Sequence, residues 1–152
     1  FDDFKERLIP FLDSIDIDLT QKTNSDEIIQ AMRSSKPTLL GVAKDLIPYF
    51  SQVESYDEKA ANKFLIGSEP VLEFVRRKLN SLEVWNEESI DHALNEAQTS
   101  LSLPTPKLNQ PIRIAMTGST QSPSLSLTLS LFDLAEVSNR IDAALEYLAN
   151  SN

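Results

Sequence analysis

The residues available for covalent or metal chemistry are few in kind. The 152-residue chain contains a single histidine, His92, and no cysteine. The lack of cysteine excludes a disulfide scaffold, a thiolate zinc site and a cysteine nucleophile. Its three glycines are scattered and form no glycine-rich phosphate loop. Carboxylates are numerous, but no pair has independent support as general acid and base. The closest pairs are typical of solvated faces or helix starts: Asp2-Asp3, Asp16 and Asp18, and Glu87-Glu88.

Charge sets a second limit on function. The formal net charge is −9, whereas a chain that binds nucleic acid through its overall charge is usually basic. A nucleic-acid role therefore requires a local site. The run Arg76-Arg77-Lys78 fits either phosphate contacts or a solvated face.

Composition places the chain among ordinary soluble globular proteins. Hydrophobic residues make up 41% and charged residues 24% of the sequence. No apolar run approaches the roughly 18 residues that a membrane helix needs. The chain begins at Phe1, with no basic segment before an apolar run, so we expect no signal peptide. We expect a cytoplasmic fragment of a longer protein.

Helical periodicity covers most of the sequence. Apolar residues recur at positions i, i+3 or i+4, and i+7, the spacing of a helix that buries one face. Pro10 lies inside the first such stripe and predicts a kink or a break, and Pro48 disturbs the end of the third. The expected helices are 1–12, 25–32, 38–50, 55–65, 71–82, 86–101 and 133–148.

One boundary and one ambiguous segment complete this pattern. Gly67-Ser68-Glu69-Pro70 combines a helix-ending glycine, a cap and a first-turn proline. It predicts two lobes, residues 1–66 and 67–152. Leucines alternate with serine and threonine from Leu125 to Leu131, and that period alone predicts a half-exposed strand.

A family resemblance adds to these observations. Residues 110–118, Gln-Pro-Ile-Arg-Ile-Ala-Met-Thr-Gly, are followed by Ser-Pro-Ser-Leu at 122–125 and by Arg140 to Leu145 on the last helix. This block resembles the C-terminal anticodon-binding domain of bacterial glutamyl-tRNA synthetases. Weaker matches occur in the same order at 37–50, 56–61 and 85–90, so the resemblance spans nearly the whole chain. It implies an all-α fold of two packed helical lobes, and it favours a helix over a strand for Leu125 to Leu131.

The resemblance also implies roles for named residues. Arg113 would read the central uracil of the anticodon, because an arginine fork can bond a base edge at two points and a lysine cannot. The alternative for Arg113 is a surface or salt-bridged arginine on a helix. Ser122, Pro123 and Leu125 would hold the first base, in a loop that Thr117 and Gly118 shape. The alternative for Ser122 and Pro123 is a plain helix start, with a serine cap and a first-turn proline.

The third base is the least specified. The family carries an arginine near the start of the helix that Thr38 opens, but this chain has Ser35 at the corresponding position. Lys36 or Arg33 would then read the base. Ordinary solvated cations are the alternative for both.

Activity and partners follow from the same resemblance. The parent enzyme would be a glutamate–tRNA ligase that uses ATP and magnesium in a catalytic domain. The HIGH-like and KMSKS-like segments of that domain are absent here, so we expect this fragment alone to be inactive and to hold no cofactor. Its partners would be the anticodon loop of glutamate tRNA and the rest of the synthetase chain, with no membrane and no DNA. The competing hypothesis is an acidic, all-helical protein-interaction domain without an RNA role.

Overall fold

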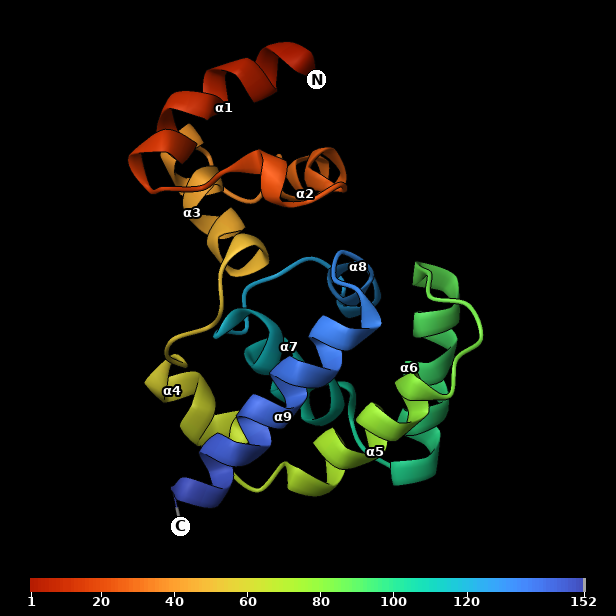
Figure 1. Cartoon of the computed structure of the whole chain (residues 1–152). Coiled ribbons are helices and arrows are strands. Elements are labelled where there is room, and N and C mark those ends of the chain that lie inside the picture. Colours follow the sequence, from red (N-terminus) through yellow and green to blue (C-terminus); the bar gives the residue numbers. More distant parts are fainter. Residues whose placement is uncertain (152) are drawn as a thin grey trace. The chain divides into compact units, whose positions relative to one another are not determined.

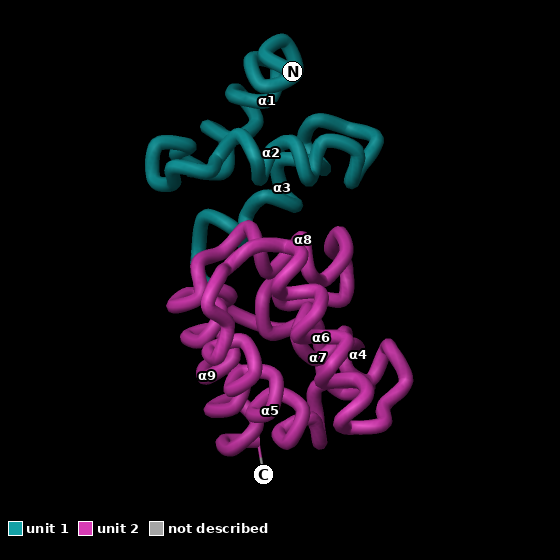
Figure 2. Tube along the Cα trace, turned by 90° about the vertical axis from the view of Figure 1, so that its right-hand side faces the viewer, with its two compact units in different colours: residues 1–52 teal, residues 53–152 magenta. Residues whose placement is uncertain are grey.

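Helices are the only regular secondary structure in the described part of the chain. The computed structural model describes residues 1–151, and these contain helices, turns and loops but no strand. The residues group into two compact units, Phe1–Gln52 and Val53–Asn152, coloured separately in Figure 2. This confirms the all-α expectation.

Unit 1 is a small helical unit. It contains α1 (Asp2–Ser14), the short 3₁₀ turn η1 (Leu19–Gln21), α2 (Ser25–Met32) and α3 (Leu39–Phe50), shown from red to gold in Figure 1. α3 packs against both α1 and α2, and an ion pair of 2.6 Å joins Lys5 on α1 to Asp26 on α2. α1 continues through Pro10 to Ser14 without the predicted break. The buried core is formed by Leu8, Leu12, Ile17, Ile28, Ile29, Met32, Val42, Ala43, Leu46 and Tyr49.

Unit 2 carries the remaining elements. They are α4 (Glu58–Ala60), the π-helical turn η2 (Ala61–Leu65), α5 (Glu69–Asn80), α6 (Glu87–Leu101), α7 (Thr105–Thr117), α8 (Leu125–Ser130) and α9 (Leu134–Asn150). α9 lies against α5 and α7, and α6 lies against α5 and α8 (Figure 1). Lys78 on α5 bonds to Glu96 on α6, and this bond is the main reason that the pKa of Glu96 is lowered. Apolar side chains from α5, α6, α7, α8 and α9 share one buried core.

The boundary between the compact units lies earlier than the sequence pattern indicated. The chain divides between Gln52 and Val53, not at the Gly67 punctuation. The reason is packing: η2 lies against α7, and the amide of Asp57 donates a 2.7 Å bond to the carbonyl of Gly118. Residues 53–66 therefore belong with the C-terminal helices. Gly67 does end a helix, with a φ of 85°.

The alternating segment is helical. Leu125 to Ser130 forms α8, so the period-based strand is wrong and the resemblance gave the correct state. The polar positions are not all on the solvent side, as a surface helix would have them, because Ser126 and Thr128 are buried. The Thr128 hydroxyl donates to the carbonyl of Pro123 at 3.3 Å, which satisfies its polar group inside the core.

Helix starts follow the predicted caps in part. Asn86 caps α6 by accepting a 2.8 Å bond from the amide of Ser89, as expected. Thr38 likewise caps α3 through the amide of Gly41. Ser122 is not a cap, because α8 begins after Ser124. None of the helices formed by residues 1–151 is both long and apolar enough to cross a membrane.

Candidate functional site

Arg113 is the centre of the best-organised polar cluster. It lies on α7, just over one turn before the helix ends. Its Nε donates to the Ser122 hydroxyl at 3.1 Å, one terminal nitrogen donates to the Gln110 side chain at 3.3 Å, and the other donates to the Pro123 carbonyl at 3.3 Å. These three partners are neutral. They fix the plane of the guanidinium.

The loop that supplies these partners is held by a glycine. Gly118 ends α7 with a φ of 83°, a left-handed conformation that other residues adopt at a cost. A Cβ atom there would lie 3.0 Å from the carbonyl oxygen of Ser55 and 3.2 Å from a methyl group of Val53. The end of α7 therefore rests directly on the 53–57 segment. Only glycine combines this conformation with this close approach.

Hydroxyl groups close the same loop on itself. The Pro123 carbonyl accepts from Arg113, from the Ser122 hydroxyl at 3.1 Å and from Thr128. Thr117 lies within hydrogen-bonding distance of the carbonyls of Arg113 and Ser119. Ser122 and Pro123 thus act as bonding partners of the arginine and not as the start of α8.

Leu125 has a different position from the other predicted residues. Its side chain is 3% exposed, in the first turn of α8. As placed, it supports the loop from within the core and offers no surface to a ligand. Arg113, Thr117, Ser122 and Pro123 are brought together by the structure, with Leu125 beneath them.

A buried arginine stabilises the end of α7, and the sequence-based argument assigned it no such role. Arg140 on α9 is 4% exposed and donates to the carbonyl of Met116. Its Nε donates to Glu136 at 3.0 Å, and its guanidinium lies 4.4 Å from the centre of the Phe132 ring. A signal existed: Arg140 falls on the buried stripe of α9, three residues after Val137. A cation at a core position needs partners inside the fold.

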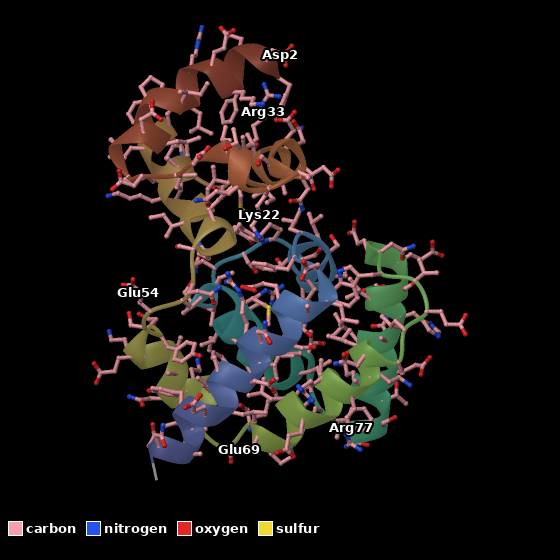
Figure 3. All side chains as sticks on the ribbon, viewed as in Figure 1. Asp2, Lys22, Arg33, Glu54, Glu69 and Arg77 are labelled. Carbon is pink, nitrogen blue, oxygen red and sulfur yellow. The ribbon has the colours of Figure 1, made fainter. Side chains whose placement is uncertain are left out.

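The predicted residues of unit 1 have other surroundings. Lys36 forms a 2.8 Å ion pair with Asp45, and its side-chain stem lies across Gly41, where a Cβ would come within 2.7 Å. Arg33 is exposed at the end of α2, with its guanidinium 5.1 Å from the centre of the Phe4 ring. Figure 3 shows Arg33 beside α1 and α2. The structure ties Lys36 to a carboxylate and leaves Arg33 without an ion pair among the described residues.

Carboxylates are absent from both stretches that hold the candidate residues. Residues 97–132 contain Lys107 and Arg113 but no aspartate or glutamate, and residues 28–44 contain three cations and no acid. This is notable in a chain of net charge −9. It is a sequence signal that motif comparison alone passes over, and it creates local surroundings that tolerate an anionic ligand.

The remaining candidates are explained by local structure. Arg76 pairs with Asp142 at 2.8 Å, and Lys78 pairs with Glu96. Arg77, which is labelled in Figure 3, lies over the Phe74 ring. His92 contacts Glu96 one turn away on α6. Among residues 1–151, no group of three histidine, cysteine or acidic side chains is arranged to hold a metal ion. The basic run is thus largely a set of ion pairs within unit 2.

Comparison with known proteins gives a consistent result. A family described as an anticodon binding domain matches residues 3–145. The chain is 37% identical over 142 residues to a glutamate–tRNA ligase of Myxococcus xanthus, covering 92% of this chain and 30% of that protein. It is 33% identical over 135 residues to a glutamate–tRNA ligase of Xanthomonas axonopodis, covering 88% and 29%. The chain therefore spans under a third of the length of these relatives.

Solved structures share the fold. A crystal structure of a glutamate–tRNA ligase from Elizabethkingia meningosepticum, in complex with its amino acid, superposes with a TM-score of 0.83 at 20% identity. The match covers 97% of this chain and 29% of that one. A glutamate–tRNA synthetase from Elizabethkingia anophelis gives a TM-score of 0.80 over 95% of this chain and 28% of that one, again at 20% identity.

Proposed function

Because this chain belongs to the anticodon-binding domain family, we propose that it reads the anticodon of glutamate tRNA for a glutamate–tRNA ligase of which it is one part. The observation that carries the proposal is the family match over residues 3–145. The Arg113 cluster within that match supplies the chemistry. The alternative of an acidic interaction domain without an RNA role lacks support from this match.

Arg113 acts on the central uracil in this proposal. Single-stranded loops are recognised by splaying bases out and bonding their edges. Uracil presents two carbonyl acceptors, and a guanidinium consists only of donors. The bond from Arg113 to Gln110 is long at 3.3 Å, so a uracil carbonyl can replace Gln110 while the Ser122 bond keeps the fork in orientation.

The other residues divide into contacts and supports. Ser122 and Pro123 contact the first base from the loop, which Thr117 and Gly118 hold in shape. Leu125, buried under that loop, positions it. Arg33 and Lys36 are proposed to act on the third base.

ATP-dependent attachment of glutamate belongs to the part of the ligase outside this chain. The glycines of this chain do not fit a phosphate-binding loop. Gly41 lies inside α3, and Gly67 and Gly118 end helices, so none forms a loop that cradles phosphates. We therefore assign ATP and magnesium to the catalytic part. The proposed location is the cytoplasm, and the proposed partners are glutamate tRNA and the rest of the synthetase chain, with no membrane or DNA.

Binding of an anticodon stem-loop tests the proposal. Fluorescence anisotropy would compare the chain's affinity for a labelled stem-loop of glutamate tRNA with its affinity for the same RNA carrying cytosine in place of the central uracil. The proposal expects about a 10- to 150-fold preference for uracil, the range of one hydrogen bond from a charged donor, because cytosine replaces the O4 acceptor by an amino donor that a guanidinium cannot bond. Equal affinity for both RNAs and for a scrambled loop would overturn it.

A further inference from the structure

A cleft in unit 2 lies apart from the Arg113 cluster. It encloses about 490 Å³ beside the turn from η2 into α5 and the first turn of α7, a volume suited to a side chain or a small ligand. Its floor is mostly apolar and two lysines lie among its lining residues. The residues that matter here are Lys63, Phe64, Ile66, Val71, Leu103 and Lys107.

The charge of this cleft is opposite to that of the molecule. Neither Lys63 nor Lys107 forms an ion pair with another described residue, and no carboxylate lines the cleft. Two other clefts in the described part of the chain are acidic. One is lined by Asp13, Asp16 and Asp18 and the other by Glu88 and Asp91. In a chain of net charge −9, a cleft with two cations selects an anionic occupant.

The apolar part of the cleft selects an aliphatic or aromatic group. Ile66 is 56% exposed, which is high for a large apolar side chain, and it lines the cleft together with the two lysines. The Lys63 ammonium is 5.2 Å from the centre of the Phe64 ring, so a cation covers this aromatic face. The remaining apolar lining residues, Ile66, Val71 and Leu103, offer aliphatic surface to an apolar side chain.

The cleft also faces away from Arg113. Lys107 and Arg113 are six residues apart on α7, which places them about 9 Å apart along the helix and about 120° apart around it. Lys107 lies in the first turn of α7, and the loop of Ser122 and Pro123 follows the last turn.

We propose that this cleft binds an acidic peptide segment of a partner protein, with one apolar anchor side chain seated against Ile66, Val71 and Leu103. Carboxylates on either side of the anchor pair with Lys63 and Lys107. This inference is independent of anticodon reading. It rests on the positive charge of the cleft and on the exposure of Ile66.

The test uses a designed peptide and the chain itself. Nitrogen-15 NMR spectra would be recorded while acetyl-Asp-Glu-Leu-Phe-Asp-Glu-amide is added. Shifts are expected at residues 63–71 and 103–107. The double substitution Lys63→Glu and Lys107→Glu should weaken binding at least tenfold. Lys59→Glu, which makes half of that charge change on an exposed residue outside the cleft, should change it less than twofold.

Two further arms make the outcome decisive. Replacing Leu-Phe in the peptide by Ser-Ser should abolish the shifts. Ile66→Ser should weaken binding of the original peptide by a few-fold. Equal binding of the serine peptide would mean attraction by charge alone and would overturn the proposal. If the anticodon stem-loop shifts residues 63–71 and the peptide does not, the cleft is an RNA contact and the proposal is wrong. Circular dichroism would verify that each variant is folded.

Discussion

Arg113 in unit 2 and Lys36 in unit 1 are both cations within carboxylate-free stretches, yet they are held in opposite ways. Three of the groups that hold Arg113 are neutral: the Ser122 hydroxyl, the Gln110 side chain and a backbone carbonyl. Lys36 is paired with Asp45. Neutral partners orient a guanidinium and preserve its charge for a ligand, whereas an ion pair neutralises the charge it holds.

Arg33 is a third arrangement. It is exposed and lies over the ring of Phe4, an interaction that positions a cation while leaving the charge in place. A candidate nucleic-acid contact therefore depends on the charge of the groups bonded to the cation as well as on whether the cation is arginine or lysine. On this basis Arg113 should contribute most to RNA binding, Arg33 less and Lys36 least.

The largest expected effect is on stability at Gly118, the residue that holds the Arg113 loop in shape. Gly118→Ala should lower the free energy of unfolding by about 2–3 kcal/mol, because left-handed strain of about 1–2 kcal/mol adds to the close approach to Ser55. Gly67→Ala is the matched control. Its φ is 85° and nothing lies within 4 Å of its would-be Cβ, so strain alone should cost about 1–2 kcal/mol. Urea denaturation measures both, and equal losses would remove the argument for close packing at Gly118.

The next effect is on binding at Arg113. Arg113→Ala should weaken anticodon stem-loop binding by about 1.5–3 kcal/mol, through loss of a hydrogen bond from a charged donor to the base. Arg113→Lys should recover little of it, since an ammonium keeps the charge but lacks the fork. Arg77→Ala removes an exposed arginine from the same unit and should leave the affinity within about twofold. Anisotropy titrations give all three values, and similar losses for Arg113→Ala and Arg77→Ala would reduce Arg113 to a nonspecific phosphate contact.

Substitution of Arg140, which supports the end of α7, should have a smaller effect on the free energy of unfolding. Arg140→Lys keeps a cation near Glu136 but loses the bond to Met116 and the planar contact with Phe132, so unfolding should become easier by about 1–2 kcal/mol. Arg7→Lys, at an exposed ion pair on α1, should change stability by less than about 0.5 kcal/mol. Urea midpoints compare the two. A loss of similar size in both variants would show that the burial of Arg140 carries no stabilisation.

The sequence could predict most of the helices because their apolar stripes are regular, but no helix was expected where α7 lies. The grouping of Arg113 with Ser122 and Pro123 followed from the family resemblance and not from a helical period. The alternating period wrongly predicted a strand where α8 forms. The buried Thr128 hydroxyl donates to the carbonyl of Pro123, and this bond allows a polar residue in a helix that packs in the core. The unit boundary was placed late because the contact of Asp57 with Gly118 joins residues distant in sequence. The pairing of Lys36 with Asp45 depends on α3 folding back over the lysine stem, which a motif comparison does not contain.

The smallest expected effect separates Arg33 from Lys36. Glutamate tRNAs carry cytosine at the third anticodon position and glutamine tRNAs carry guanine, so stem-loops that differ only there report on the reading of that base. Arg33→Ala should reduce the preference for cytosine by less than about 1 kcal/mol, the size of one exposed charged contact. Lys36→Ala should reduce it less, because Asp45 already neutralises the lysine.

Asp45→Asn removes that carboxylate and releases the ammonium. If Lys36 reads the base, Asp45→Asn should strengthen binding a few-fold, and adding Lys36→Ala should cancel the gain. If Arg33 reads it, Asp45→Asn should leave the preference unchanged. A preference that none of the three substitutions alters would show that the end of α2 and the start of α3 do not read the third base.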